Sequence, residues 1–399
     1  MTGDRKVHSY PFGDSGGLGL DPRYGRLRRE EPVARVRLPY GEDGWLATRY
    51  DDVKKVLSDP RFRSSLARGD AMPRVTPNIE RDSSLLSMDP PEHTRIRRLV
   101  SMAFTPRRIE AMRPVVQQLT DSLLDDMEAK GAPADLVPAL TMPLPIHVIC
   151  EMLGVPLADQ SRFLGWTEVA MSVDLEGEDR IVAAMHQLMA YFGELIEERR
   201  RAPADDLLTA LVVARDERDS LSEEELIGFG MLLLIAGHET TANQLGNFVY
   251  TLLTHPEQLA ALRERPELLG GAVEEMLRLT PLTSSAHFLR VAAEDVELGP
   301  VTVRAGEAVL VSLPSANRDE AVFDRPDEFV VDRDHNPHIA FSHGAHYCIG
   351  ASLARMEFRI AIGTLLSRFP HLELAVPADE ITFKRNRLIR GLESLPVRW

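Results

Sequence analysis

The sequence predicts a mainly α-helical protein with a small β region, and three observations lead to this fold class. Residues 222–253 contain no proline, helical patterns fill most of the chain after residue 89, and the strand-like runs are short. Ser222, followed three residues later by Glu225, has the form of a capping box, which marks a helix start. At about 1.5 Å per residue, a helix from Ser222 to Leu253 would be roughly 45 Å long, which is the width of a domain. It must therefore cross the core.

The other elements follow in chain order. Strand-like runs at 34–38 and 44–48 precede a proline-punctuated segment, which we expect to be a loop. Asp89 before two prolines and Thr105 before Pro106 are helix start signals, and we expect Pro114 to split the second helix into two. Further helices are expected near 115–130, 140–153, 180–200, 206–216, 256–264, 267–279 and 349–369, with a strand at 307–313.

The composition limits the classes of function. The 399 residues include 46 Lys and Arg against 61 Asp and Glu, a net charge of −15, which disfavours binding along a nucleic-acid backbone. Two cysteines provide no disulfide framework and indicate a reducing compartment. The charged N-terminal residues contain no apolar stretch of the kind expected in a signal peptide, and the longest uncharged apolar run, 226–237, is shorter than the roughly 18 residues of a membrane span. We expect a soluble cytoplasmic protein that binds neither nucleic acid nor membrane.

The long helix carries a polar interruption at mid-length, where burial should be greatest. Its sequence is Ala-Gly-His-Glu-Thr-Thr at 236–241. Gly237 has no Cβ, and Thr240 is able to donate its hydroxyl to the carbonyl of Ala236. An acid and an alcohol beside a glycine suggest a ligand, while a kink packed against other helices is the alternative. A zinc-protease motif would need a second His at position 242, which is Ala.

The strongest signal is the segment 341–350, Phe-Ser-His-Gly-Ala-His-Tyr-Cys-Ile-Gly. It brings Cys348 to the start of a helix, where backbone N–H groups favour a thiolate. One cysteine cannot make a structural zinc site without companions, so a metal-binding thiolate here fits the axial position of a haem better. A buried inert cysteine is the alternative, and Cys150, in an apolar context, is interpreted in that way.

The residues of this segment resemble the motif of a known protein family. Phe341, Gly344, His346, Cys348 and Gly350 resemble the haem-thiolate signature of cytochromes P450. The resemblance covers nearly the whole chain, because two more motifs match: the Glu-x-x-Arg pair and the oxygen-binding helix. Arg333 would join the Glu-x-x-Arg pair as the third member of a Glu-Arg-Arg triad. The matching residues are Glu275, Arg278, Ala236, Gly237, Glu239 and Thr240. The resemblance implies the cytochrome P450 fold, with haem b between the long central helix and the Cys loop.

The resemblance also assigns roles to individual residues. Cys348 would bind the iron, and Glu239 and Thr240 would handle the protons that O2 activation needs. The other cofactor-binding residues would be Gly237, Phe341, Gly344 and Gly350, and the two haem propionates would be bound by His93, Arg97, Arg290 and His346. Glu275, Arg278 and Arg333 would be scaffold. One departure is Ser342, since many bacterial relatives have glycine there, and it implies an altered loop conformation or reduction potential.

The resemblance implies the reaction and its partners. Similar soluble actinobacterial enzymes hydroxylate or epoxidise small natural products with O2, and segments 61–87, 163–189 and 283–289 would contact such a substrate. Residues 1–399 are expected to form a single P450 domain without a fused reductase, so electrons would come from a ferredoxin and a ferredoxin reductase. One candidate for the face on which ferredoxin docks is a basic stretch of the chain. The alternative is that these arginines are only solvated at the surface or serve the propionates. The stretch comprises Arg95, Arg97, Arg98, Arg107, Arg108 and Arg113.

Two other functions stay open at this point. One is a haem-thiolate protein that binds or recruits a partner without turnover, and the other is a peroxide-using oxygenase of the same fold. Both more typically lack the acid–alcohol pair, which is present here as Glu239 and Thr240.

Overall fold

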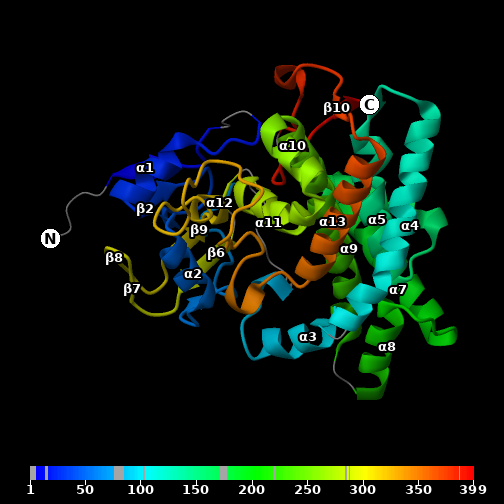
Figure 1. The fold of residues 1–399 in the computed structure, drawn as a ribbon. Helices are drawn as coiled ribbons and strands as arrows, with labels where there is room; N and C mark the ends of the chain where they lie inside the picture. The colour runs from blue at the N-terminus through cyan, green and yellow to red at the C-terminus, as the bar shows by residue number, and fades with distance from the viewer. Residues whose placement is uncertain are drawn as a thin grey trace. The chain divides into compact units, whose positions relative to one another are not determined.

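The computed structural model describes residues 6–13, 17–75, 85–101, 104–170, 178–218, 221–283, 285–286, 288–385 and 387–399. The chain forms two compact units, each built from two separate stretches of sequence (Figure 1). Unit 1 comprises residues 1–94 and 270–349, and unit 2 comprises residues 95–269 and 350–399. The predicted fold class, mainly α-helical with a small β region, is confirmed.

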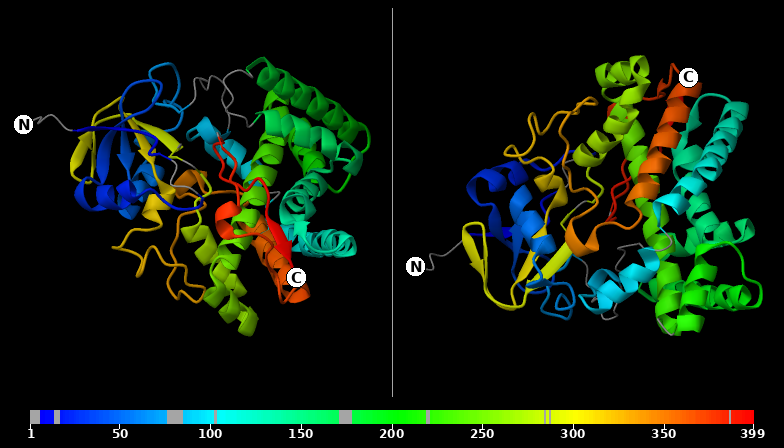
Figure 2. Two further views of the ribbon diagram at one scale, coloured as in Figure 1. Left: turned by 90° about the horizontal axis from the view of Figure 1, so that it is seen from above. Right: turned by 60° about the horizontal axis from the view of Figure 1, so that its bottom comes forward.

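Unit 1 is organised around a six-stranded mixed sheet with the strand order β1-β2-β3-β9-β6-β4. Its strands are β1 (Val7–Ser9), β2 (Val33–Arg37), β3 (Gly44–Ala47), β4 (Phe62–Arg63), β6 (Phe288–Ala292) and β9 (Ala308–Val311). Neighbouring residues of β2 and β3 enter different apolar clusters, as the period of two in a strand requires. Trp45 packs with α2 (Tyr50–Ser58), and Leu46 packs with α1 (Pro22–Glu30), so a helix covers each face (Figure 2).

The rest of unit 1 leads toward the Cys loop. A two-stranded hairpin, β7 (Val296–Leu298) and β8 (Val301–Val303), lies between β6 and β9 in the chain. The helix α11 (Leu269–Leu279) precedes β6, and α12 (Leu313–Ala316) follows β9. From residue 317 to the short 3-10 turn at Gly344–His346, the chain is irregular.

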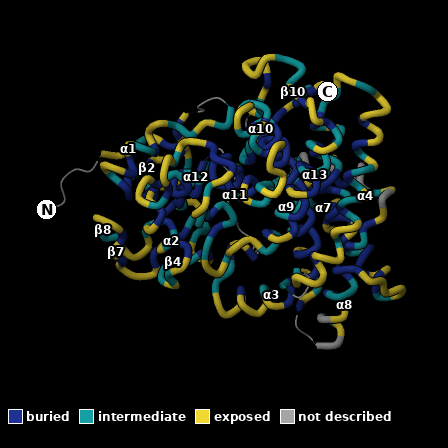
Figure 3. The backbone as a smooth tube through the Cα atoms, in the orientation of Figure 1, coloured by how far each residue is buried: buried dark blue, intermediate teal, exposed yellow. Residues whose placement is uncertain are grey.

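Unit 2 is helical and built around α9 (Glu223–Leu253). The predicted capping box is present: Ser222 Oγ accepts from the N–H of Glu225 at 3.0 Å, and Glu225 Oε2 accepts from the N–H of Ser222 at 2.7 Å. The helices that pack against α9 include α5 (Pro143–Leu153), α7 (Glu178–Arg201), α8 (Leu207–Arg218), α10 (Pro256–Glu264) and α13 (Ala351–Arg368). The prediction that the long helix lies in a core is therefore confirmed (Figure 3).

The remaining elements of unit 2 lie around these helices. α4 (Pro106–Lys130) packs on α5 and α13, and α6 (Gln160–Ala170) packs on α7. A π-helical turn, Val137–Thr141, leads into α5, and α3 (Glu92–Ser101) precedes α4. A small sheet has the order β10-β11-β5, with β5 (Ala134–Asp135), β10 (Glu373–Leu374) and β11 (Pro396–Arg398).

One expectation about the elements was wrong, and several helices were missed. Pro114 does not split a helix, because α4 continues through it to Lys130. Pro114 is exposed, and so is Glu110, the residue whose carbonyl loses its hydrogen bond. The helices α1, α2 and α6 were not predicted from the sequence. Among the described residues, no helix is sufficiently long and apolar to span a membrane.

Candidate active site

The Cys loop lies in unit 1 and ends in an exposed thiol. The N–H of Cys348 donates to the carbonyl of Phe341 at 2.9 Å, and the N–H of Tyr347 donates to that of Gly344 at 3.1 Å, so the loop closes on itself. Cys348 is exposed, whereas Cys150 is buried in α5. Burial raises the pKa of the Cys150 thiol to about 12, which keeps it protonated and unreactive. Cys348 is therefore the cysteine that a ligand can reach.

Two residues of this loop adopt the left-handed backbone region. Gly344 has φ of 73°, and a Cβ at this position would lie 2.4 Å from the carbonyl oxygen of Leu57 in α2, so no side chain fits. Ser342 has φ of 67°, a conformation that costs a residue with a Cβ about 1 kcal/mol. The loop thus keeps a glycine-like conformation at Ser342 at the cost of local strain.

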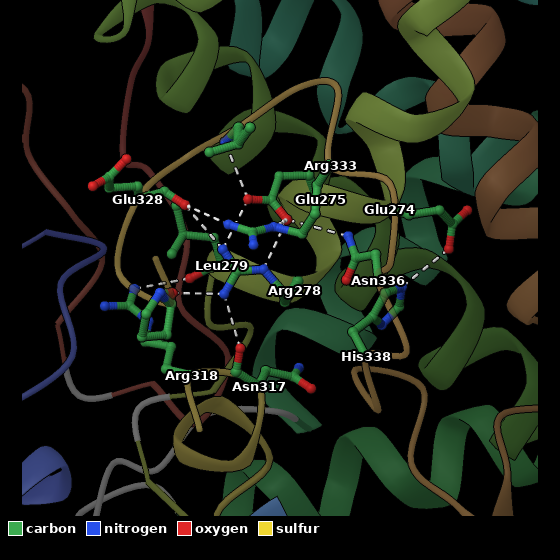
Figure 4. Close-up of polar contacts among 12 residues, drawn as sticks. Glu274, Glu275, Arg278, Leu279, Asn317, Arg318, Glu328, Arg333, Asn336 and His338 are labelled. Atoms are coloured by element: carbon green, nitrogen blue, oxygen red, sulfur yellow. Dashed lines mark hydrogen bonds and ion pairs between the residues drawn. The ribbon is translucent and has the colours of Figure 1, made fainter. Parts of the chain in front are cut away.

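A buried charge cluster, shown in Figure 4, fixes the segment that leads into the loop. Glu275 and Arg278 of α11 form two parallel hydrogen bonds of 2.7 and 2.8 Å, and both side chains are 0% exposed. Nε of Arg333 donates to the same carboxylate at 2.9 Å. The triad that the resemblance implied is therefore formed.

The remaining polar atoms of this cluster bind the irregular chain between α12 and the loop. Arg278 donates to three backbone carbonyls, those of Asn317 at 2.9 Å, Pro326 at 2.6 Å and Glu328 at 2.9 Å (Figure 4). Glu275 accepts from the N–H of Val330 at 3.1 Å. A buried ion pair is stabilising only when its other donors and acceptors are satisfied. Here they are satisfied by the backbone of 317–330, so the pair fixes the path of that chain.

Three of the four predicted propionate ligands lie in unit 1, where the structure brings two of them together. The rings of His93 and His346 have centroids 4.3 Å apart, and Nε2 of His346 lies 3.3 Å from Oγ of Ser64. Arg290, in β6, is 5% exposed. The fourth residue, Arg97, follows His93 by one turn of α3.

Arg290 shows that this region suits an anion. Its Nη1 donates to the carbonyl of Leu289 at 2.9 Å, and no carboxylate of the described chain forms an ion pair with it. Burial lowers the pKa of Arg290, and the charge of Asp89 opposes that shift. The oxygens of Asp89 accept from the backbone of Ser64 and Ser65 and from the hydroxyl of Ser65. A buried guanidinium without a carboxylate partner matches a haem propionate.

The Cys348 thiol is also chemically suited to bind haem. Within the described ranges, no cluster of three or more His, Cys, Asp or Glu side chains is arranged to hold a metal ion. A cysteine thiolate is one of the axial ligands by which proteins bind haem iron, so Cys348 suits that role.

The polar segment of α9, in unit 2, is more open than the part of the helix that follows it. Thr240 Oγ donates to the carbonyl of Ala236 at 2.7 Å, as predicted. Ala236 is exposed, and Glu239 and Thr240 are half-buried, whereas residues 241–249 are all buried. The expectation of greatest burial here was wrong, because the helix presents its acid–alcohol pair at an accessible stretch. Such a stretch suits a reacting ligand better than a packed kink does.

Two glycines of the predicted site have different surroundings. A Cβ on Gly237 would lie 3.0 Å from Cδ1 of Ile149 in α5, so this glycine allows α5 to pack closely against α9. A Cβ on Gly350, the N-cap of α13, would meet no described atom within 4 Å.

The predicted site residues thus fall into two groups. Unit 1 holds the Cys loop, His93, Arg290 and the scaffold triad, and unit 2 holds Arg97, Gly350 and the polar segment of α9. Of the segments expected to contact substrate, residues 76–84, 171–177, 284 and 287 lie outside the described residues. Asn243 donates to the carbonyl of Glu239, and Lys384 donates to Asn243. Both residues were missed from the sequence because no local spacing connects them.

Comparison with known proteins identifies close relatives over the full length. The family model for cytochrome P450 matches residues 171–386. The chain is 52% identical over 394 residues to nocardicin C N-oxygenase of Nocardia uniformis subsp. tsuyamanensis, covering 98% of this chain and 99% of that protein. It is 49% identical over 395 residues to mycinamicin IV hydroxylase/epoxidase of Micromonospora griseorubida, covering 98% of each.

A solved structure agrees with these relatives. The LnmA cytochrome P450 hydroxylase from the leinamycin biosynthetic pathway of Streptomyces atroolivaceus superposes with a TM-score of 0.94 at 54% identity. The match covers 98% of this chain and 100% of that one.

Proposed function

Because the chain belongs to the cytochrome P450 family and is a monooxygenase that uses haem b, we propose that it oxygenates a small natural product by hydroxylation or epoxidation. The observation that carries this proposal is the exposed Cys348 thiol, held in a loop that Gly344 and the Glu275 cluster fix in place. The similarity to an N-oxygenase, a hydroxylase/epoxidase and a biosynthetic hydroxylase supports the substrate class. The intact acid–alcohol pair favours turnover with O2 over a purely binding role.

The residues described above would hold the cofactor. The Cys348 thiolate binds the iron, and His93, Arg97, Arg290 and His346 bind the propionates. When bound, haem supplies the centre at which O2 is activated and one oxygen atom is inserted into a C–H or C=C bond. Arg290 gains an anionic partner in this arrangement, which offsets the cost of burying its guanidinium.

Glu239 and Thr240 manage protons beside that centre. The Thr240 hydroxyl donates to the carbonyl of Ala236, so its oxygen presents lone pairs as an acceptor. The half-buried Glu239 carboxylate is able to exchange protons with water and pass them toward Thr240. Together they would deliver protons at a controlled position, next to residues 241–249 of α9, which are all buried.

The proposed function is tested with purified protein, a ferredoxin, its reductase and NAD(P)H. A panel of actinobacterial natural products is first screened for compounds that change the haem spin state. Each compound that does so is then incubated under ¹⁸O₂, and the product mass is measured. One ¹⁸O atom per product molecule is expected, and incorporation of oxygen from water alone would refute a monooxygenase role.

Thr240→Ala is expected to retain haem and to consume NAD(P)H, but to form about 10-fold less product per NAD(P)H, because protons are no longer delivered at a fixed position. The lost reducing equivalents should appear as hydrogen peroxide. Thr251→Ala is the control, since that hydroxyl makes the same type of bond, to the carbonyl of Asn247, further along α9. Equal product yields in the parent and Thr240→Ala would contradict the role of Thr240.

Electrons are proposed to come from a separate cytoplasmic ferredoxin and its reductase, with residues 1–399 acting as one P450 domain. Two arginines of the basic stretch already have carboxylate partners. Arg95 is paired with Glu225 at 2.6 Å, and Arg113 is paired with Glu110 at 2.5 Å. Arg107 and Arg108 are exposed in the first turn of α4, where the helix dipole disfavours cations. Their placement against this local preference favours a role in binding an acidic partner.

Arg108→Glu is expected to slow reduction by ferredoxin about 10-fold at low ionic strength, because it reverses the charge that attracts an acidic partner. Salt should reduce the difference, since screening weakens exposed charges. Arg26→Glu, at an exposed position of α1, makes the same change in net charge and is the control. Stopped-flow reduction rates at several salt concentrations provide the measurement, and equal rates for both variants would exclude Arg108 from docking.

A further inference from the structure

Two short C-terminal segments, 382–384 and 391–393, pair with each other and lie against the middle of α9; we call them the clasp. Phe383 and Leu392 form an antiparallel bridge, and the N–H of Lys384 donates to the carbonyl of Gly391 at 2.8 Å. A Cβ on Gly391 would lie 1.9 Å from Oδ1 of Asn243, so the missing side chain permits close contact with α9. The clasp therefore touches α9 one turn after the acid–alcohol pair.

Asn243 connects the clasp to that pair. Its side chain is buried, with the residue 4% exposed, and both ends of its amide are used. Nδ2 donates to the carbonyl of Glu239 at 2.8 Å, and Oδ1 accepts from Nζ of Lys384 at 3.1 Å. An ammonium group only donates, so Lys384 requires the oxygen end of the amide to face the clasp. The nitrogen end must then face the carbonyl of Glu239.

The orientation of the Asn243 amide matters because side-chain hydrogen bonds fix two backbone carbonyls of the helix at the acid–alcohol pair. Thr240 Oγ donates to the carbonyl of Ala236, and Asn243 Nδ2 donates to that of Glu239. If the amide were reversed, two oxygen atoms would face each other at Glu239 and an NH2 group would face the ammonium. Removing the ammonium removes the charge that prevents this reversal.

Lys384 supplies the charged donor to the amide of Asn243. His238, the neighbour of Glu239, is 1% exposed, and its pKa is lowered to about 4 by burial and, to a smaller extent, by the charge of Lys384. The imidazole is therefore neutral near pH 7 and does not replace the ammonium as a charged donor to Asn243.

We propose that Lys384 is a positioning residue for the monooxygenase reaction. It acts through Asn243, whose amide it orients so that the backbone of Glu239 and Thr240 is held in the geometry that proton delivery requires. This inference rests on the proposed function of that pair.

The test compares three variants of the haem-loaded enzyme with the parent. Lys384→Met removes the ammonium, Lys384→Arg keeps a cationic donor, and Arg385→Met removes the neighbouring cation, which is exposed. Two properties are measured: amide hydrogen exchange in peptides covering 239–247, and product formed per NAD(P)H. The carbon monoxide spectrum of each variant establishes that the haem site is intact.

For Lys384→Met, exchange in 239–247 is expected to be about 5-fold faster, since one hydrogen bond that orders the segment is lost. Product per NAD(P)H is expected to fall about 3-fold, because small displacements of positioned groups slow productive reaction. Lys384→Arg should restore both properties, and Arg385→Met should change neither. In the Asn243→Ala background, Lys384→Met should add no further loss.

The inference is overturned if Lys384→Met leaves either property at the parent value. It is also overturned if Lys384→Arg is as impaired as Lys384→Met, or if the losses from Lys384→Met and Asn243→Ala add independently. Thr240→Ala in the same assay separates the two proposals. If Thr240→Ala keeps full product yield, the function proposed for the pair fails, whereas unchanged exchange in Lys384→Met refutes the role of Lys384 alone.

Discussion

Cys348→His is expected to convert the carbon monoxide spectrum of the reduced protein from the thiolate type to the imidazole type, with more than about 100-fold loss of product formation. Substitution of groups that only support a metal ligand costs 10–100-fold, and the ligand itself should cost more. The reason is electronic, since a thiolate donates electron density that favours O–O cleavage and an imidazole donates less. Imidazole still binds iron, so the variant should retain haem. The effect of changing the iron ligand can then be distinguished from the effect of misfolding.

The structure provides a matched control for this substitution. Cys150→Ser changes the other cysteine, which is buried in α5 with a protonated thiol. It should leave the thiolate-type spectrum unchanged, although the buried hydroxyl lowers stability. A Cys348→His spectrum identical to that of the parent would show that another residue binds the iron.

Arg278→Met is expected to lower the free energy of unfolding by about 3–5 kcal/mol, because it leaves the Glu275 carboxylate buried without its main partner. Both side chains are 0% exposed, so water cannot replace the guanidinium. The variant also loses the hydrogen bonds to the carbonyls of Asn317, Pro326 and Glu328. The segment leading to the Cys loop should then lose its fixed path, and haem should dissociate more readily.

Thermal unfolding followed by circular dichroism and by haem absorbance measures both effects of Arg278→Met. The midpoint should fall by on the order of 10 °C, with haem absorbance lost before the helical signal. Arg304→Met is the control, because it removes an arginine whose pair with Asp295 lies at the surface, and its midpoint should equal that of the parent. Equal midpoints for Arg278→Met and the parent would contradict a stabilising role for the buried cluster.

Local sequence patterns predicted those helices, strands and site residues that are determined by their neighbours in the sequence. The capping box at Ser222 correctly placed the start of α9, and the contiguous segment 341–350 identified Cys348. Pro114 led to a wrong prediction because the hydrogen bond that a proline removes is tolerated at an exposed position of a helix, and both Pro114 and Glu110 are exposed. The bond between Arg333 and Glu275 joins residues 58 positions apart, so only the family resemblance could predict it.

Contacts between distant segments explain what the sequence could not predict. The need for glycine at 344 comes from the carbonyl of Leu57 in α2, a helix that the sequence did not reveal. The close contact that the missing Cβ of Gly237 permits is with Ile149 of α5. Lys384 and Asn243 are 141 residues apart, and neither belongs to a motif. In each case the physical cause is a partner brought close by folding.

The carbon monoxide difference spectrum of the reduced parent protein tests the central claim most directly. The claim is that Cys348 binds a haem iron as a thiolate in a monooxygenase of the cytochrome P450 family. A thiolate-type band is the expected result for protein purified with its haem. An imidazole-type band in intact, correctly folded protein would contradict the account.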